Sequence, residues 1–247
     1  MLRSLLKKIS GSMSNLLDEF SLEDISEADN HILQSVKPYT MTSPARVFSV
    51  LEAVRYVLKS NLRGSIVECG VWRGGIMMAA ALLLRTYERY DKDLYLFDSF
   101  DGMPLPADVD TDFRGRKAKA QFLARKRSEN SSNWCYASLP EVQANLESID
   151  YPKSKIHFVA GMVENTVPKL APEEIAILRL DTDWYASTKH ELTHLYPRLV
   201  KGGVLIIDDY GHWQGARKAV DEYFEENSIS ILLNRIDHTG RIAVRTS

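Results

Sequence analysis

The stretch "AILRLDTDWYAST", residues 176–188, is a continuous apolar run that ends abruptly in two acids, Asp181 and Asp183. A second stretch, "GGVLIIDDYG" at residues 202–211, also ends in clustered acids. Short apolar runs without polar alternation are typical of parallel strands in a sheet that is covered on both faces. Since the carboxyl ends of parallel strands lie at one edge of the sheet, we expect the two groups of acids to converge there.

Short apolar runs and helical patterns alternate through the rest of the chain. The other runs are "GSIVECG" (64–70), "DLYLFDSF" (93–100), "KIHFVAG" (155–161) and two that flank "DHTG" (237–240). Helices between the runs indicate βαβ units, and "DHTG" indicates a hairpin turn. The sequence therefore predicts an α/β fold with a mostly parallel seven-stranded sheet and an antiparallel C-terminal strand. This is the Rossmann-like arrangement of class I methyltransferases.

Residues 1–60 are predicted to form a helical extension that packs on the main domain, which spans residues 61–247. Within it, Ser43 can cap a helix and Pro44 suits the first helical position. Apolar residues then recur at three- and four-residue spacing. The first 20 residues suit an amphipathic helix that docks on the body or on another subunit, with a membrane surface as the alternative.

The composition argues against several classes of protein. With 45% hydrophobic residues, the 247-residue chain can bury one sizeable core. Its 31 basic and 33 acidic residues give a net charge of -2, which offers no electrostatic case for nucleic acid. No apolar run reaches the roughly 18 residues of a membrane span. Cys69 and Cys135, the two cysteines, indicate neither a disulfide framework nor a zinc site, so we expect a cytoplasmic location.

An insertion at residues 104–135 interrupts the alternation of strands and helices. It opens with prolines and acids in "PLPADVDTDFRGRK" and continues in the basic run "KAKAQFLARKR". It is too long for an ordinary connection, so a lid, a substrate loop or a disordered excursion is expected. The basic run fits either a solvated helix face or a charge contact with an anionic substrate.

A glycine turn follows the first predicted strand in "IVECGVWRGG", residues 66–75. Glu68, Gly70 and Gly74 stand at this junction, where glycines let the backbone approach a ligand. The pattern is neither G-x-G-x-x-G nor G-K-[ST], which disfavours a dinucleotide or a triphosphate. A ligand with an amino acid end suits the turn, because N–H groups can bind its carboxylate and Glu68 can hold its ammonium. The alternative is a tight turn without a ligand.

The ends of the next two strands extend this predicted donor site. Asp98 and Ser99 end the second strand, where an acid commonly accepts hydrogen bonds from ribose hydroxyls. Asp98 could instead cap the following loop. Gly161 and Met162 follow the third strand and could wall an adenine ring.

Asp181, Asp208 and Asp209 are the predicted metal ligands. Clustered anions repel one another unless they share a cation, and oxygen ligands without cysteine or clustered histidine favour Mg²⁺, with Mn²⁺ or Ca²⁺ as alternatives. Beside a sulfonium methyl donor, a metal would bind a substrate hydroxyl and lower its pKa. Asp181 or His212 could then take the proton. Asp183 is a supporting contact, and the acids could instead cap the next helices or face solvent.

Several motifs together resemble those of the macrocin O-methyltransferase family, over roughly residues 39–227. They are "YTMTSPARV", "VECGVWRGG", "FDSFDGMP", "LRLDTDWYAST" and "VLIIDDYGHWQGARKAVDEYF". The resemblance implies methylation of a sugar hydroxyl with S-adenosylmethionine and Mg²⁺, in a homo-oligomer. It implies metal binding by Asp181, Asp208 and Asp209, donor binding by Glu68, Gly70 and Asp98, and an approach to the donor by Met41 and Thr42. In one departure, "GMVENTVP" stands where the family usually has "GWFEDTLP".

The acceptor is expected to be a deoxysugar of a natural product or a sugar of a polysaccharide. The insertion does not resemble that of the antibiotic enzymes, which keeps both classes open. Two other functions remain as alternatives: a non-catalytic binding protein with a methyltransferase fold, and a metal-dependent α/β hydrolase that uses the same acids.

Overall fold

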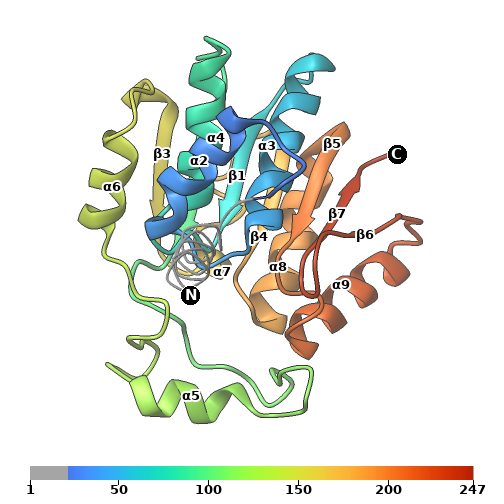
Figure 1. Ribbon diagram of the computed structural model, residues 1–247. Helices are drawn as coiled ribbons and strands as arrows, with labels where there is room; N and C mark the ends of the chain where they lie inside the picture. Colours follow the sequence, from blue (N-terminus) through green and yellow to red (C-terminus); the bar gives the residue numbers. More distant parts are fainter. Residues whose placement is uncertain (1–21, 247) are drawn as a thin grey trace, which may run out of the picture.

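The computed structural model describes residues 22–246, and Figure 1 shows a twisted sheet with helices on both sides. The strands are β1 (Ser65–Cys69), β2 (Leu94–Asp98), β3 (Ile156–Ala160), β4 (Ile175–Leu180), β5 (Leu199–Ile207), β6 (Asn234–Arg235) and β7 (Arg241–Val244). The α-helices are α2 (Glu27–Val36), α3 (Pro44–Lys59), α4 (Gly75–Thr86), α5 (Ala118–Arg125), α6 (Leu139–Glu147), α7 (Val163–Thr166), α8 (Tyr185–Leu195) and α9 (Gln214–Glu226). Short 3-10 turns are η1 (Lys37–Tyr39), η2 (Lys153–Lys155) and η3 (Tyr196–Arg198).

The sheet has the strand order β3-β2-β1-β4-β5-β7-β6. Strands β1 to β5 pair in parallel, whereas β7 runs antiparallel to both β5 and β6. This confirms the predicted sheet, including its antiparallel C-terminal end. The order reverses direction beside β1 and β4, which is the place where open α/β sheets bind ligands at the carboxyl ends of their strands.

Alternation along each strand divides the core into two layers. In β4, Ile177 packs in one layer with α2, α3 and α4, whereas Leu178 packs in the other with α8 and α9. Ile206 and Leu205 of β5 divide in the same way. Neighbouring side chains of a strand point to opposite faces, so both faces need apolar residues. This explains why the strands are continuous apolar runs.

Helix α3 begins where its capping residues predict. The Ser43 side chain accepts a hydrogen bond from the Arg46 N–H at 3.3 Å, and Pro44 is the first helical residue. Leu33 of α2 and Leu51 of α3 are fully buried in the layer that covers β1 and β4. Helices α2 and α3 therefore share one core with the sheet. The amphipathic helix predicted for the first 20 residues lies outside the described residues.

The insertion at 104–135 is folded and carries helix α5, which Figure 1 shows set apart from the helices on the sheet faces. Two of its residues cap core helices whose own N-cap residues, both tryptophans, provide no side-chain hydrogen bond. Asp110 accepts a hydrogen bond from Tyr185 N, the first N–H of α8, at 2.8 Å. The carbonyl of Thr111 accepts one from Gln214 N, the first N–H of α9, at 2.8 Å. The insertion is thus anchored at the start of both helices.

No helix in the described part of the chain is long and apolar enough to cross a membrane.

Candidate active site

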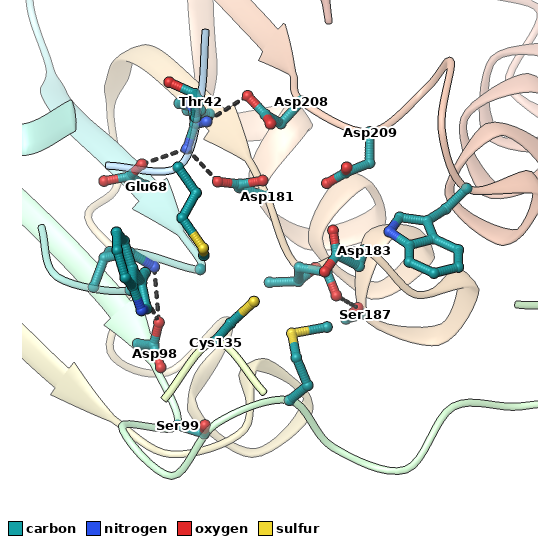
Figure 2. Close-up of a pocket in the computed structure, with 18 of the residues that line it drawn as sticks. Thr42, Glu68, Asp98, Ser99, Cys135, Asp181, Asp183, Ser187, Asp208 and Asp209 are labelled. Atoms are coloured by element: carbon teal, nitrogen blue, oxygen red, sulfur yellow. Dashed lines mark hydrogen bonds and ion pairs between the residues drawn. The ribbon is translucent and has the colours of Figure 1, made fainter. Parts of the chain in front are cut away.

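A cavity of about 580 Å³ lies at the carboxyl ends of the parallel strands. Its walls come from the loops after β1 to β5, the segment before α3, the insertion, and the β6–β7 turn. Most predicted site residues line it: Thr42, Glu68, Gly70, Asp98, Ser99, Gly161, Met162, Asp181, Asp208, Asp209 and His212. Met41 and Asp183 line it as well. Figure 2 shows the acids gathered on one side and Asp98 with Ser99 on the other.

Gly74 does not line this cavity in the described structure. It precedes α4 with φ 86°, and a Cβ atom placed there would lie 2.6 Å from the Leu146 side chain of α6. The left-handed turn therefore favours glycine here, and the turn packs closely against α6. This differs from the predicted contact with a donor.

Asp98 holds the glycine turn from the neighbouring strand. Its Oδ2 accepts hydrogen bonds from the N–H groups of Val71 at 2.7 Å and Trp72 at 3.2 Å. Its Oδ1 accepts one from Phe100 N at 2.8 Å, so the predicted alternative of a loop cap is realised. Burial nonetheless raises the pKa of Asp98, against these hydrogen bonds. Oδ2 already accepts two hydrogen bonds, but Oδ1 accepts one and has a second lone pair, which leaves capacity for a ribose hydroxyl.

A buried arginine, Arg179 in β4, joins the two sides of the cavity. Its Nη1 lies 2.5 Å from Glu68 Oε1 and 2.7 Å from Asp181 Oδ2, and its Nη2 binds Asp208. The side chain of Arg179 is 3% exposed and those of Glu68 and Asp208 are buried as well, whereas Asp181 is 23% exposed. Sequence reasoning missed Arg179. The one available signal was a charge inside the otherwise apolar strand "IAILRL".

Glu68 lies at the end of β1, and only one of its two carboxylate oxygens has a hydrogen-bond partner. Oε1 pairs with Arg179, while the buried Oε2 has no hydrogen-bond partner among the described residues. Burial raises the pKa of Glu68 to about 7, although Arg179 opposes this. An unpaired buried carboxylate oxygen is costly, which favours a ligand that brings a cation or a donor. The ammonium predicted for the methyl donor would meet this need.

Asp181, Asp208 and Asp209 each bring one carboxylate oxygen to within 4.8 Å of the others. Both oxygens of Asp208 already pair with arginines, Oδ1 with Arg179 and Oδ2 with Arg46. Oδ2 of Asp209 is buried without a partner among the described residues. Burial and the neighbouring carboxylates raise the pKa values of Asp181 and Asp209 well above the usual range, with Arg179 opposing this at Asp181. The three residues therefore fit a hard divalent cation, which would share the cluster with the two arginines.

Asp183 adds a further carboxyl group at the edge of this cluster. Its backbone is left-handed, with φ 67°, and this turns the side chain back toward Asp209, as Figure 2 shows. Burial raises its pKa to about 7, and the charges of Asp181 and Asp208 add to the effect. Trp72 and Cys135 also line the cavity with positive φ. Such backbone conformations are uncommon outside glycine and concentrate at functional sites.

His212 follows the acid pair on the loop before α9. Its ring contacts Trp213 and Phe113, with centroids 4.7 and 5.7 Å away. Burial lowers its pKa, and His238, Arg116 and Arg46 contribute in the same direction. The imidazole is therefore neutral near pH 7 and able to accept a proton.

The insertion supplies the wall between the two sides of the cavity. Figure 2 places Cys135 between Asp98 and Asp183. Next to it, Trp134 packs against Trp184 and Trp213, with ring centroids 5.5 and 6.0 Å away. These contacts link residues far apart in the chain, and no local pattern in the sequence indicated them.

The strand order and the position of this cavity define an α/β protein with the class I methyltransferase fold. The sequence model of the family described as macrocin-O-methyltransferase (TylF) matches residues 19–245. The chain therefore belongs to the macrocin O-methyltransferase family, as its motifs suggested, and is an O-methyltransferase.

Two characterised relatives cover most of the chain. Demethyldecarbamoylnovobiocin O-methyltransferase of Streptomyces niveus is 34% identical over 209 residues, which are 84% of this chain and 76% of the relative. Mycinamicin III 3''-O-methyltransferase of Micromonospora griseorubida is 33% identical over 202 residues, 82% of this chain and 76% of the relative.

Solved structures agree with the fold. The O-methyltransferase NovP superposes with a TM-score of 0.74 at 32% identity, over 85% of this chain and 83% of its own. The calicheamicin methyltransferase CalS11 superposes with a TM-score of 0.64 at 21% identity, over 95% of this chain and 91% of its own, and supports the fold alone.

Proposed function

We propose that the protein transfers a methyl group from S-adenosylmethionine to a hydroxyl group of a sugar and that it needs Mg²⁺ to do so. The observation that carries the proposal is the shared cavity, in which Arg179 links Glu68 on the donor side to Asp181 and Asp208 on the metal side. A relative of Streptomyces olivaceus, 31% identical over 228 residues, is named 8-demethyl-8-(2,3-dimethoxy-alpha-L-rhamnosyl)-tetracenomycin-C 4'-O-methyltransferase, and the rhamnosyl group in this name supports a sugar as the acceptor.

The donor would lie along the ends of β1, β2 and β3. In this proposal the unpaired oxygen of Glu68 would bind the amino acid end. Asp98 and Ser99 would bind the ribose, and Gly161 and Met162 would contact the adenine ring; all of these residues line the cavity. Thr42 and the exposed Met41 come from the segment before α3 and would cover the donor from the other side. Gly70 brings the β1 turn against the backbone of Asp181, which sets the donor side close to the acids.

When bound, the donor supplies an electrophilic methyl group and Mg²⁺ lowers the pKa of an alcohol. Asp181, Asp208 and Asp209 would hold the cation. The sugar hydroxyl must lose its proton as its oxygen bonds to the methyl carbon, and two residues can accept that proton. His212 is neutral and lines the cavity, while Asp181 belongs to the acid cluster and is held by Arg179. The walls formed by Trp134 and Trp213 would keep water from the methyl group.

The experiment is a methyl-transfer assay with labelled S-adenosylmethionine and a panel of neutral and charged sugars, after metal removal and with Mg²⁺ added back. We expect transfer only with Mg²⁺, and a loss of about 10- to 100-fold in Asp209→Asn, the range seen when metal sites are perturbed. Asp221→Asn is the control, because its side chain is 51% exposed in a surface pair on α9.

Each part of the proposal can fail separately. Transfer that is unaffected by metal removal would reject the Mg²⁺ requirement. If S-adenosylhomocysteine does not raise the melting temperature, the donor assignment is wrong and the binding-protein alternative gains support. Hydrolysis of a sugar ester without any methyl donor would favour the hydrolase alternative.

A further inference from the structure

The basic run of the insertion is the largest local concentration of charge near the cavity. Between Phe113 and Ser128 the chain has seven basic residues and no acidic one, against a net charge of -2 for the whole protein. The seven are Arg114, Arg116, Lys117, Lys119, Arg125, Lys126 and Arg127, and all are exposed. Helix α5 buries only Ala118 and Phe122, so its basic side chains face solvent.

Most of this charge is not neutralised within the protein. Lys117 and Arg127 pair with exposed acids, Asp108 and Asp101, at 3.0 Å. Among the described residues, Arg114, Lys119, Arg125 and Lys126 form no ion pair. A further acid of the insertion, Asp110, caps α8 and does not pair with the basic run.

Arg116 is the residue of the basic run that lines the cavity. Its Nε donates a hydrogen bond to Asp112 Oδ2 at 2.6 Å. Asp112 is 2% exposed and is held in turn by the backbone N–H groups of Arg114 and Arg116, both at 2.9 Å. The guanidinium is therefore held in place at its Nε atom. Its two terminal nitrogens have no partner among the described residues, and its side chain is 69% exposed.

The surroundings of Arg116 suit an anion attached to the acceptor. His212 and His238 line the same cavity as Arg116. His212 lies in the loop after β5, and His238 lies in the β6–β7 turn. Phe113, which is 50% exposed, contacts the His212 ring and lies under the Arg114 guanidinium at 5.1 Å. A neutral sugar would leave the charges of Arg116 and of the rest of the basic run unused. Planar guanidinium groups bind phosphate oxygens through paired hydrogen bonds.

We propose that the acceptor is a sugar esterified to a phosphate or diphosphate, with the sugar at the acids and the phosphate at Arg116 and the basic run. This rests on the proposed function and narrows its substrate class. The methyl group goes to the sugar hydroxyl, and the phosphate ester stays intact throughout. The basic run would also raise the rate of encounter with the anion, an effect that salt screens.

The test measures calorimetric binding of inorganic pyrophosphate, uridine diphosphate and neutral uridine to protein saturated with S-adenosylhomocysteine, without divalent cations. We expect both anions to bind and uridine not to bind. Arg116→Gln should weaken anion binding at least about tenfold, which corresponds to about 1.4 kcal/mol. Raising the salt concentration should weaken it further.

The control removes two positive charges near the amino-terminal ends of the strands, away from the cavity. Lys153→Gln with Lys201→Gln changes exposed side chains before β3 and near the start of β5, and should leave anion binding unchanged. If Arg116→Gln proves unstable, Lys119→Gln with Lys126→Gln keeps Asp112 paired and should weaken binding by a smaller factor.

The outcomes are distinct. Tighter binding of uridine diphosphate than of pyrophosphate supports a sugar nucleotide, and equal binding supports a phosphate carried by another glycan. If S-adenosylhomocysteine binds but neither anion does, the inference is overturned while the proposed function stands. An equal loss of anion binding in the control variant would also overturn it, since the site would then be general surface charge.

Discussion

Arg179 is the residue on which most of the cavity's charge balance depends. Three carboxylates, at the ends of β1, β4 and β5, share its buried guanidinium. Removing one partner of such a buried group leaves the others uncompensated. The clustered acids therefore already have two resident cations, Arg179 and Arg46, and a metal would be an addition to them.

Arg179→Met should lower the free energy of unfolding by about 3–5 kcal/mol, the usual cost of breaking a buried ion pair. Chemical denaturation at pH 7 measures this. Arg217→Met is the matched control, since Arg217 is 53% exposed in a surface pair with Asp221 and should cost less than about 1 kcal/mol. Equal losses in the two variants would show that Arg179 is not the main stabilising partner of the acids.

Gly70 fixes the distance between two strand ends. It has φ 81°, and a Cβ atom there would lie 2.1 Å from the carbonyl oxygen of Asp181. Gly115 has a similar φ of 77° with nothing within 4 Å of the same position. The two glycines thus separate the effect of backbone conformation from that of close approach.

Gly115→Ala should cost about 1–2 kcal/mol, the penalty for a left-handed residue with a side chain. Gly70→Ala should cost about 1–3 kcal/mol more because the clash must also be relieved. It should also weaken binding of S-adenosylhomocysteine, which Gly115→Ala should not. Thermal unfolding and calorimetry check both statements, and similar behaviour of the two variants would contradict them.

At the scale of elements, the insertion does two things. It caps α8 and α9 through Asp110 and Thr111, and it supplies Trp134, Cys135 and Arg116 to the cavity. Because the capped helices belong to the core, the insertion is anchored at Asp110 and Thr111. Its basic helix α5 is exposed. This arrangement suits a wall of the acceptor site better than a freely moving lid.

Asp110→Ala should loosen the insertion. The N–H groups of Tyr185 and Ala107 would lose their acceptor, at a cost of about 1–3 kcal/mol. Trypsin should then cut faster between Arg114 and Arg127, as followed by mass spectrometry. Asp108→Ala is the control, since Asp108 is 81% exposed in a surface pair with Lys117. Unchanged cleavage in Asp110→Ala would mean that other contacts hold the insertion.

At the scale of the whole molecule, the C-terminal hairpin is tied to the start of α3. Asp237 in the β6–β7 turn accepts hydrogen bonds from the Ser43 hydroxyl at 2.6 Å and from Gly240 N at 2.8 Å. Arg46 then bridges Asp237 and Asp208. The start of α3 and the β6–β7 turn thus meet at the cavity, to which His238 also contributes.

This junction should make stability depend on acid pH. Burial alone would raise the pKa of Asp237, but Ser43, the turn N–H groups and Arg46 hold it well below its usual range. A depressed folded pKa stabilises the fold above the unfolded pKa of about 3.9, and the contribution is lost as pH falls below that value.

Asp237→Asn should therefore cost about 1–3 kcal/mol at pH 7, and the difference from the native protein should shrink as pH falls from about 4. Denaturation at a series of pH values measures this. Asp91→Asn, in an exposed pair with Arg89, should change stability by less than about 1 kcal/mol. If the difference in stability between the two proteins grows toward low pH, the predicted direction of the Asp237 pKa shift is wrong.

Much of the architecture could be predicted from local patterns. Apolar runs, helix caps and the "DHTG" turn depend on neighbours in sequence, and they led to the sheet that the structure has. The convergence of Asp181 with Asp208 and Asp209 also followed, because parallel strands end at one edge of a sheet. The motifs likewise indicated the family to which the chain belongs.

Other features were decided only by the tertiary structure. Arg179 meets Glu68 across 111 residues of sequence, and Asp110 caps a helix 75 residues away. Gly74 packs on α6 because of how that helix lies on the sheet. The physical reason is the same in each case: hydrogen bonds and close packing depend on distances that the folded core sets. Residue type and spacing determine which elements form and where their ends lie, whereas the partner of each buried charge depends on how those elements pack.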